Sequence, residues 1–232
     1  VIVLDSTLCS GQALSASISS PVTGTTFTWT ATPTAGITGS SNGTGTGINQ
    51  TLTNSQTTQG SVVYTITTVN PTNNVCPIET KVRTITVEPI PHITFSGQNQ
   101  NLCSNLLSSP INLTSDVIGS SIAWTVSNPS NLTGVSLSGS TSIPAQTIVN
   151  SGLTSGTVTY TATATINSCT GPSSMYTIEV YPLPVLSINL TEDTICSNTA
   201  VNAQLTSNIL NTSFTWSVSP NVSVSGMSNG SG

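Results

Sequence analysis

An ordered set of landmark residues recurs along the sequence every 92 to 96 residues, and this repetition constrains the fold more than any other feature. Each unit has a first cysteine, a tryptophan 20 or 21 residues later, a tyrosine 35 or 36 residues further on, a second cysteine and a Pro-x-Pro sequence. These landmarks are Cys9, Trp29, Tyr64, Cys76 and Pro89–Pro91 in the first unit, and Cys103, Trp124, Tyr160, Cys169 and Pro182–Pro184 in the second. Cys196 and Trp216 begin a third unit. We therefore predict three consecutive domains, at residues 1–90, 91–183 and 184–232.

The third unit aligns with the first without a gap at an offset of 187 residues, so that residues 224–232 match residues 37–45. This alignment places Gly232 about halfway through the unit. We therefore expect a truncated third domain that contains only its N-terminal half. The orphan cysteine, Cys196, is expected to have its partner near position 263, beyond the end of this chain.

Charged residues make up only 4% of the sequence, against about 25% in an average protein. Lys81 and Arg83 are the two cations and the formal net charge is −5, which argues against nucleic acid or an anionic membrane as a partner. No run approaches the 18 apolar residues of a membrane span, so no membrane insertion is expected. The sequence opens on a strand-like VIVL without a signal peptide, which suggests a mature segment of a longer protein.

Alternating apolar and hydroxyl residues predict an all-β chain. In FTWTA at 27–31 and VYTIT at 63–67 every second residue is apolar or aromatic, as expected of half-buried strands. Short strands of this kind around one tryptophan, over about 93 residues, are typical of an immunoglobulin-like β-sandwich. We predict tandem sandwiches in a linear rod, with core positions at Trp29, Tyr64, Trp124, Tyr160 and Trp216.

The cysteines are expected to form disulfides within each domain. The second cysteine of each unit should lie in the hairpin loop after the tyrosine strand and pair with the first strand, as Cys9–Cys76 and Cys103–Cys169. Each bridge would close a loop of about 67 residues and add roughly 4 kcal/mol of stability. Such bridges imply an extracellular location. A metal site is not expected, because the sequence has no Cys-x-x-Cys and only one histidine, His92.

Taken together, these motifs resemble the PKD-like repeats of very large bacteroidete cell-surface proteins. In the first unit they are LCSG at 8–11, FTWT at 27–30, GSSNG at 39–43, VYTIT at 63–67, Cys76 and TITVEPIP at 84–91. The resemblance covers essentially the whole chain. It implies a rod-forming surface module of the gliding-motility adhesin type, exported by the type IX route. The second unit departs from the pattern, because residues 134–139 lack the Ser-Asn-Gly turn.

The Pro-x-Pro sequences are expected to be stiff linkers. Pro89 and Pro91 at one joint, and Pro182 and Pro184 at the other, each flank a single residue and favour an extended backbone. A short, stiff linker should keep consecutive sandwiches in line, so the expected partners are the neighbouring repeats of the same chain.

Two further sites are considered near the domain ends. Asp-Ser/Thr-apolar sequences place Ser6 and Thr194 in a pattern that resembles the bacteroidete O-glycosylation signal, although a simple acidic turn before a strand is the alternative. Calcium at the joints is another alternative, but the nearby acids are neither clustered nor repeated in the second unit, so no metal is predicted. These acids are Asp5, Glu88, Glu192 and Asp193.

Catalysis is not expected, nor is a cofactor. His92 adjoins Pro91 and has no counterpart in the next unit, and Glu192 and Asp193 point to opposite sides of an extended chain. The threonine row at 157–165 could order water as ice-binding surfaces do, but threonine is also an ordinary solvent-facing strand residue.

We predict a structural repeat segment of a large extracellular adhesin or surface filament, a stalk that presents an adhesive region away from the cell for attachment or gliding. One alternative is a module that binds surface glycans or other surface proteins through the loop at 39–47. Another is a spacer of a secreted hydrolase. The predicted core position of every tryptophan favours the stalk.

Overall fold

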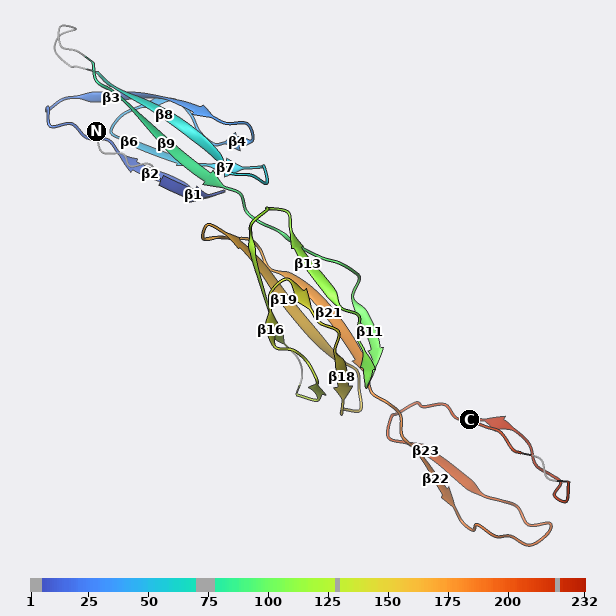
Figure 1. The fold of residues 1–232 in the computed structure, drawn as a ribbon. Helices are drawn as coiled ribbons and strands as arrows, with labels where there is room; N and C mark the ends of the chain where they lie inside the picture. Colours follow the sequence, from blue (N-terminus) through green and yellow to red (C-terminus); the bar gives the residue numbers. More distant parts are fainter. Residues whose placement is uncertain (1–5, 70–77, 128–129, 220–221) are drawn as a thin grey trace.

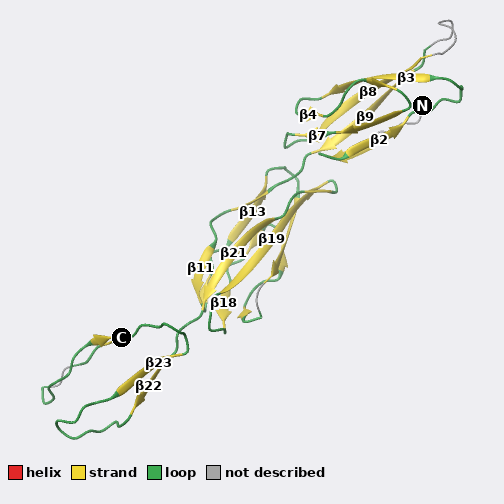
Figure 2. Ribbon diagram, turned by 180° about the vertical axis from the view of Figure 1, so that it is seen from behind, coloured by secondary structure: helices red, strands yellow, loops and turns green. Residues whose placement is uncertain are grey.

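The computed structural model describes residues 6–69, 78–127, 130–219 and 222–232, which form strands and no helix. Two β-sandwich domains and a smaller third unit follow one another along a rod (Figures 1 and 2). The prediction of an all-β tandem array is therefore confirmed. No helix in the described residues has the length and apolar character needed to cross a membrane.

The first domain has two layers. Its larger sheet has the order β1-β9-β8-β3-β5, and two strand pairs, β2–β6 and β4–β7, complete the sandwich. The strands are β1 (Ser6–Cys9), β2 (Ala13–Ser17), β3 (Thr26–Pro33), β4 (Ile37–Thr38), β5 (Gly43–Thr44), β6 (Gly47–Thr51), β7 (Thr53–Asn54), β8 (Gly60–Val69) and β9 (Thr80–Glu88). The first strand pairs in parallel with the last, so both run toward the second domain and end beside each other, with Cys9 opposite Glu88.

The second domain repeats this plan. Its larger sheet has the order β11-β21-β19-β14-β16, with β20 paired to β19, and it faces the sheets β10-β13-β17 and β12-β18-β15. The strands are β10 (Ile93–Phe95), β11 (Gln100–Cys103), β12 (Leu106–Leu107), β13 (Ile111–Ser115), β14 (Ser121–Ser127), β15 (Leu132–Thr133), β16 (Ser138–Gly139), β17 (Ser142–Ile143), β18 (Thr147–Asn150), β19 (Gly156–Ile166), β20 (Cys169–Thr170) and β21 (Ser174–Tyr181). Here too the first and last strands of the large sheet run in parallel, with Cys103 opposite Tyr181.

The third unit contains two strand pairs, β22–β23 and β24–β25. Its described strands are β22 (Leu186–Leu190), β23 (Ala203–Ser207), β24 (Thr215–Trp216) and β25 (Gly230–Ser231). In this part of the structure no strand corresponds to β8 or β19, the tyrosine strands that cover the tryptophans of the other domains. Trp216 is therefore 44% exposed, so its predicted core position is wrong for this chain.

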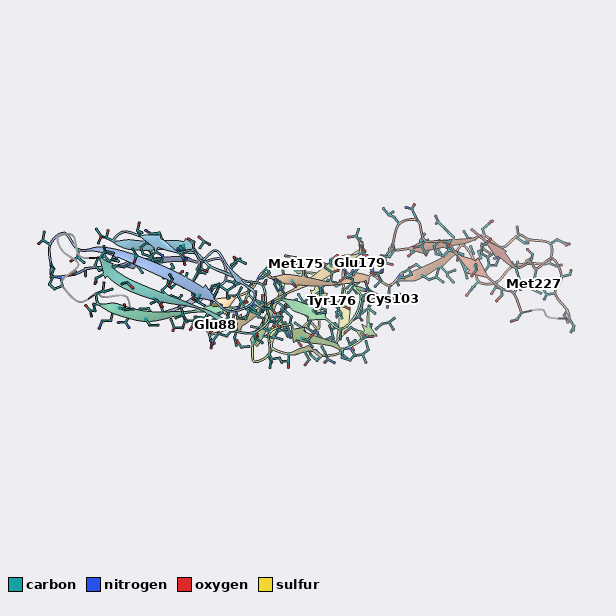
Figure 3. All side chains as sticks on the ribbon, turned by 90° about the horizontal axis from the view of Figure 1, so that it is seen from above. Glu88, Cys103, Met175, Tyr176, Glu179 and Met227 are labelled. Carbon is teal, nitrogen blue, oxygen red and sulfur yellow. A yellow bond between two sulfur atoms is a disulfide. The ribbon has the colours of Figure 1, made fainter. Side chains whose placement is uncertain are left out.

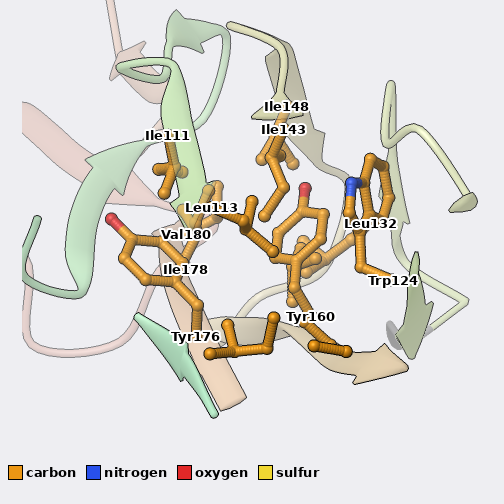
Figure 4. Packing of buried hydrophobic residues seen from close by; sticks show 14 residues of the cluster. Ile111, Leu113, Trp124, Leu132, Ile143, Ile148, Tyr160, Tyr176, Ile178 and Val180 are labelled. Atoms are coloured by element: carbon orange, nitrogen blue, oxygen red, sulfur yellow. The ribbon is translucent and has the colours of Figure 1, made fainter. Parts of the chain in front are cut away.

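Each complete domain buries a tryptophan and a tyrosine in its core. Trp124 and Tyr160 meet edge to face with their ring centroids 5.5 Å apart (Figure 4), and Trp29 and Tyr64 are buried at the equivalent positions. The Tyr64 hydroxyl donates to Gln50 at 2.6 Å, and Gln146 donates to the Tyr160 hydroxyl at 3.0 Å. Burial raises the pKa of Tyr64 to about 12, so this hydroxyl stays neutral and hydrogen-bonded inside the sandwich.

A glycine lies against each tryptophan ring. An ideal Cβ atom on Gly43, Gly139 or Gly230 would come within 2.4 Å of the ring of Trp29, Trp124 or Trp216 respectively. Each glycine is also the strand partner of its tryptophan. A side chain there would displace the ring, which explains why glycine occupies this strand position. The second unit therefore keeps this contact although its sequence lacks the Ser-Asn-Gly turn.

The outer faces of the large sheets carry many threonines. The row predicted on β19 alternates with buried residues, as expected, and it continues onto neighbouring strands. Thr159 lies opposite Thr177 of β21, and Thr161 lies opposite Thr125 of β14. These hydroxyl side chains supply polarity where the chain has almost no charge.

Candidate functional site: the bridged joint between domains

A disulfide joins the first domain to the second. Cys9 and Cys169 are bonded, with Cα atoms 5.4 Å apart and a sequence separation of 160 residues. Cys9 contributes the end of β1, and Cys169 contributes the hairpin between β19 and β20, which reaches back toward the first domain (Figure 1). The predicted pairings Cys9–Cys76 and Cys103–Cys169 are therefore wrong.

The topology explains this correction. Cys103 lies opposite Tyr181 at the end of β21, whereas Cys169 lies in a hairpin beyond Ser174, where β21 begins. The eight residues from Ser174 to Tyr181 span about 23 Å of strand, and bridged cysteines need Cα atoms within about 7 Å. The two cysteines of the second domain therefore lie at opposite ends of it and cannot bond. Cys76 lies outside the described residues.

The hairpin that carries Cys169 is a tight two-residue turn. Ile166 pairs with Cys169 across it, and the turn residues Asn167 and Ser168 have φ angles of +45° and +70°. Two successive positive φ angles characterise the type I′ turns whose twist suits a β-hairpin. Asparagine tolerates this conformation better than most residues, so the local sequence favours a turn at this point.

A hydrogen bond from this hairpin reaches the first domain next to the disulfide. The Asn167 side-chain amide donates to Glu88 Oε1 at 2.9 Å, and Gln59 donates to the same oxygen at 2.6 Å. Glu88 is only 2% exposed. Burying a carboxyl group is costly unless its oxygens accept hydrogen bonds, and one of these two donors comes from the neighbouring domain. Docking of the second domain thus helps to satisfy a buried group of the first.

The linker itself is covered. Pro89 and Pro91 are both buried, and an ideal Cβ on Gly171 would lie 1.7 Å from the Pro91 carbonyl oxygen. Only glycine allows the hairpin backbone to approach the linker this closely. Pro91 of the predicted linker is therefore packed against the hairpin of the following domain.

The residue after the linker is fixed to the second domain. The His92 backbone N–H donates to Asp116 Oδ1 at 2.7 Å, and its ring Nδ1 lies 3.1 Å from Asp116 Oδ2. Burial alone would raise the pKa of Asp116, but hydrogen bonds from the His92 backbone and ring outweigh it and lower the pKa. His92 thus serves as a joint residue, with an acidic partner that the sequence did not reveal.

A polar network behind each first cysteine fixes the end of its strand. Ser10 Oγ accepts from the Asn54 backbone N–H at 2.8 Å, and the Asn54 side chain donates to the Val87 carbonyl at 2.9 Å. In the second domain Ser104 and Asn150 make the same contacts, including a 2.8 Å bond to the Val180 carbonyl. A serine follows the first cysteine of every unit in the sequence, whereas the partner asparagine is recognisable only in the structure.

The remaining predicted sites lie apart from this joint. Ser6 is a partly buried residue of β1, and Thr194 is exposed and bonds only its neighbour Asp193, at 3.4 Å, in the hydrogen bonds described. O-glycosylation at both stays a prediction. Pro182 is partly buried and Pro184 is exposed. The described residues contain no group of three or more His, Cys, Asp or Glu side chains placed to hold a metal ion.

Comparison with known families identifies the repeats. A family model described as "PKD-like domain" matches residues 6–91, 100–184 and 193–232. The chain belongs to the PKD-like domain family. No curated protein matched the sequence.

Solved structures with similar architecture include extracellular repeat proteins. The PKD-like chain is similar to protocadherin gamma B2 extracellular cadherin domains 3–6, at 12% identity and a TM-score of 0.38, over 88% of this chain and 53% of that one. Mouse cadherin-23 EC22–24 is matched at 11% identity and a TM-score of 0.37, over 89% and 75%. Fibronectin(III)-like modules of Clostridium thermocellum CbhA are matched at 10% identity and a TM-score of 0.31, over 78% and 90%. The chain spans about half the length of the protocadherin fragment.

Proposed function

We propose that these PKD-like repeats form a load-bearing stalk in a large extracellular adhesin or surface filament. The stalk holds an adhesive region away from the cell, with domain boundaries near residues 90 and 183. The sequence resemblance extends the proposal to a bacteroidete surface protein that is exported by the type IX route and serves attachment or gliding. The observation that carries the proposal is the disulfide between consecutive domains.

A bridge between domains changes the path of a pulling force. Tension applied at the two ends enters β1, crosses from Cys9 to Cys169 through the disulfide, and leaves through β21. Residues 10–168 lie outside this path, so tension does not stretch them while the bridge is intact. A disulfide within one domain would protect only that domain, whereas this bridge protects the joint as well.

Noncovalent contacts in the same joint resist bending. The buried linker, the hydrogen bond from Asn167 to Glu88 and the close approach of Gly171 all hold the second domain against the end of the first. Two glycines of the loop at 39–47, the binding surface of the alternative function, pack closely against other residues of the first domain. An ideal Cβ atom on Gly39 would lie 1.9 Å from the Thr51 carbonyl oxygen, and one on Gly43 would lie 2.4 Å from the Trp29 ring. These contacts support a structural use of that loop.

Single-molecule stretching of the chain from its two ends tests the proposal. The 160-residue separation of the bridged cysteines corresponds to about 550 Å of extended chain. We expect this length to be absent from force–extension traces under oxidising conditions and to appear after reduction. Release of the same total length with and without reductant would contradict a load-bearing bridge. Binding of a two-repeat fragment to a glycan array would instead support the binding alternative.

A further inference from the structure

Cys103 occupies the same place in the second domain as Cys9 in the first. Each cysteine ends a strand that runs parallel to the last strand of its sheet, Cys9 opposite Glu88 and Cys103 opposite Tyr181. The next residue donates its backbone N–H to the carbonyl of that partner, at 2.9 Å for Ser10 and 2.7 Å for Ser104. The backbone that presents the two thiols is thus held in the same way.

The Cys103 thiol is free and exposed, and it lies where the second domain meets the third unit (Figure 3). Beyond it the linker has the same length as at the first joint, since β10 begins five residues after β9 ends and β22 begins five residues after β21 ends. The residue after the linker is also fixed in the same way: Val185 donates its N–H to Asn208 Oδ1 at 2.7 Å, as His92 does to Asp116. The following domain therefore starts from an equivalent position at both joints.

We propose that Cys103 forms the equivalent bridge, to a cysteine in the β19–β20-type hairpin of the third repeat. One period of 93 residues after Cys169 places this partner at about position 262, so it is the cysteine near position 263 that the sequence alone assigned to Cys196. Cys196 occupies the same position in the third unit and would bridge to the fourth repeat. The first cysteine of each repeat thus bonds the second cysteine of the next, and every joint is closed covalently.

The proposed bonds form overlapping loops. From Cys9 the covalent path crosses to Cys169 and then follows the backbone for 27 residues to Cys196. From Cys196, in the third repeat, it would cross again to the fourth repeat. Twenty-seven residues extend to at most about 95 Å, so each pair of repeats has a fixed maximum length under load. Without the bridges a single unfolded repeat of 93 residues could extend to about 320 Å.

Bridge formation needs an oxidant, for which a dithiol–disulfide protein of the extracytoplasmic space is the appropriate chemical class. The Cys103 thiolate attacks the donor disulfide and forms a mixed disulfide, and one donor sulfur leaves as a thiolate. The hairpin thiolate then attacks the Cys103 sulfur and releases the reduced donor. Two cysteine thiols lose two protons and two electrons in total, and the donor disulfide becomes a dithiol.

The test is disulfide mapping of the parent protein, or of this chain continued through the whole third repeat. Free thiols are alkylated without reductant, and the unreduced digest is analysed by mass spectrometry. We expect a peptide that contains Cys103 linked to the hairpin cysteine of the third repeat. Alkylated Cys103, or Cys103 linked within its own domain or to a second molecule, would overturn the proposal.

A matched variant supplies an independent readout. Cys103→Ser should add one alkylation, on the hairpin cysteine of the third repeat, and should leave the Cys9–Cys169 peptide unchanged. No added alkylation would overturn the proposal. Both results are independent of the stalk function, since the stretching experiment depends only on the Cys9–Cys169 bridge.

Discussion

The two joints of this chain have similar linkers and differ in what covers them. Glu88, at the first joint, is 2% exposed, whereas Tyr181 at the corresponding position of the second is 43% exposed. Pro91 is buried and Pro184 is exposed. The difference follows from one element, the hairpin of the next domain, which covers the first joint and has no counterpart in the described part of the third unit. The rigidity of a joint thus depends on this hairpin as well as on the Pro-x-Pro sequence.

Removal of the disulfide should have the largest effect, because it should make the first joint freer and so more like the second. Cys9→Ser should lower the free energy of unfolding by about 2–5 kcal/mol, as loss of a native disulfide does in small extracellular domains. Small-angle scattering should show a wider distribution of angles between the first two domains. Cys103→Ser is the matched control, because its thiol is free in this chain, and it should change the stability by less than about 0.5 kcal/mol. Equal losses in urea denaturation would mean that the Cys9 bridge adds nothing.

A methyl group added between the hairpin and the linker should have the next largest effect on stability. Gly171→Ala places a methyl group against the Pro91 carbonyl, and we expect a loss of about 1–3 kcal/mol in thermal denaturation, as for overpacking in a core. Gly97→Ala is the control, since an ideal Cβ there has no neighbour within 4 Å. If both variants melt at the temperature of the parent chain, the hairpin does not pack tightly on the linker.

A smaller effect is expected from loss of the hydrogen bond between domains. Asn167→Gly removes the donor to Glu88 and keeps the left-handed turn, so the expected loss is about 1–2 kcal/mol. Ser168→Gly changes the same turn and leaves the bond in place, which makes it the matched control. Chemical denaturation that gives the same loss for both would assign the effect to the turn instead.

Lowering the pH should have the smallest effect on stability, and it should change only the first joint. The lowered pKa of Asp116 means that its contribution is complete above the ordinary value of 3.8 and is lost as the pH falls through the lowered value. The group is largely exposed, so the contribution should be below about 1 kcal/mol. The His92 amide resonance should shift in that acidic window, and the Val185 amide should not, because Asn208 does not titrate. Asp116→Asn should abolish the His92 shift, and persistence of the shift in that variant would refute the assignment.

The β-sandwich fold could be predicted from the sequence more completely than the contacts between the first two domains. The regular spacing of Trp29, Trp124 and their tyrosines, within alternating strands, was enough to predict tandem sandwiches, because burial of one strand face follows directly from that alternation. The exposure of Trp216 does not follow from the pattern of its own strand, because burial of this tryptophan depends on a strand from elsewhere in the domain.

The cysteine partners could not be deduced because spacing alone leaves several connectivities open. The periodic sequence made each domain look self-contained, and the parallel pairing that carries Cys9 and Cys103 to the far end of their domains is a property of topology. The roles of Asn167 and Gly171 are hidden for a similar reason, because Asn167 contacts the preceding repeat and Gly171 contacts the linker. Glu88 is recognisable in the sequence as an acid beside the linker, but its amide partners are not.

The most direct test of the bridged joint uses the two cations of the chain. Trypsin cleaves after Lys81 and Arg83, between Cys9 and Cys169, so complete digestion in denaturant separates a fragment that holds Cys9 from one that holds Cys169. With the disulfide between domains, the two fragments should remain joined on a non-reducing gel until reductant is added, and in Cys9→Ser they should separate at once. Separation of the parent fragments without reductant would show that no disulfide joins the two domains and would contradict the account.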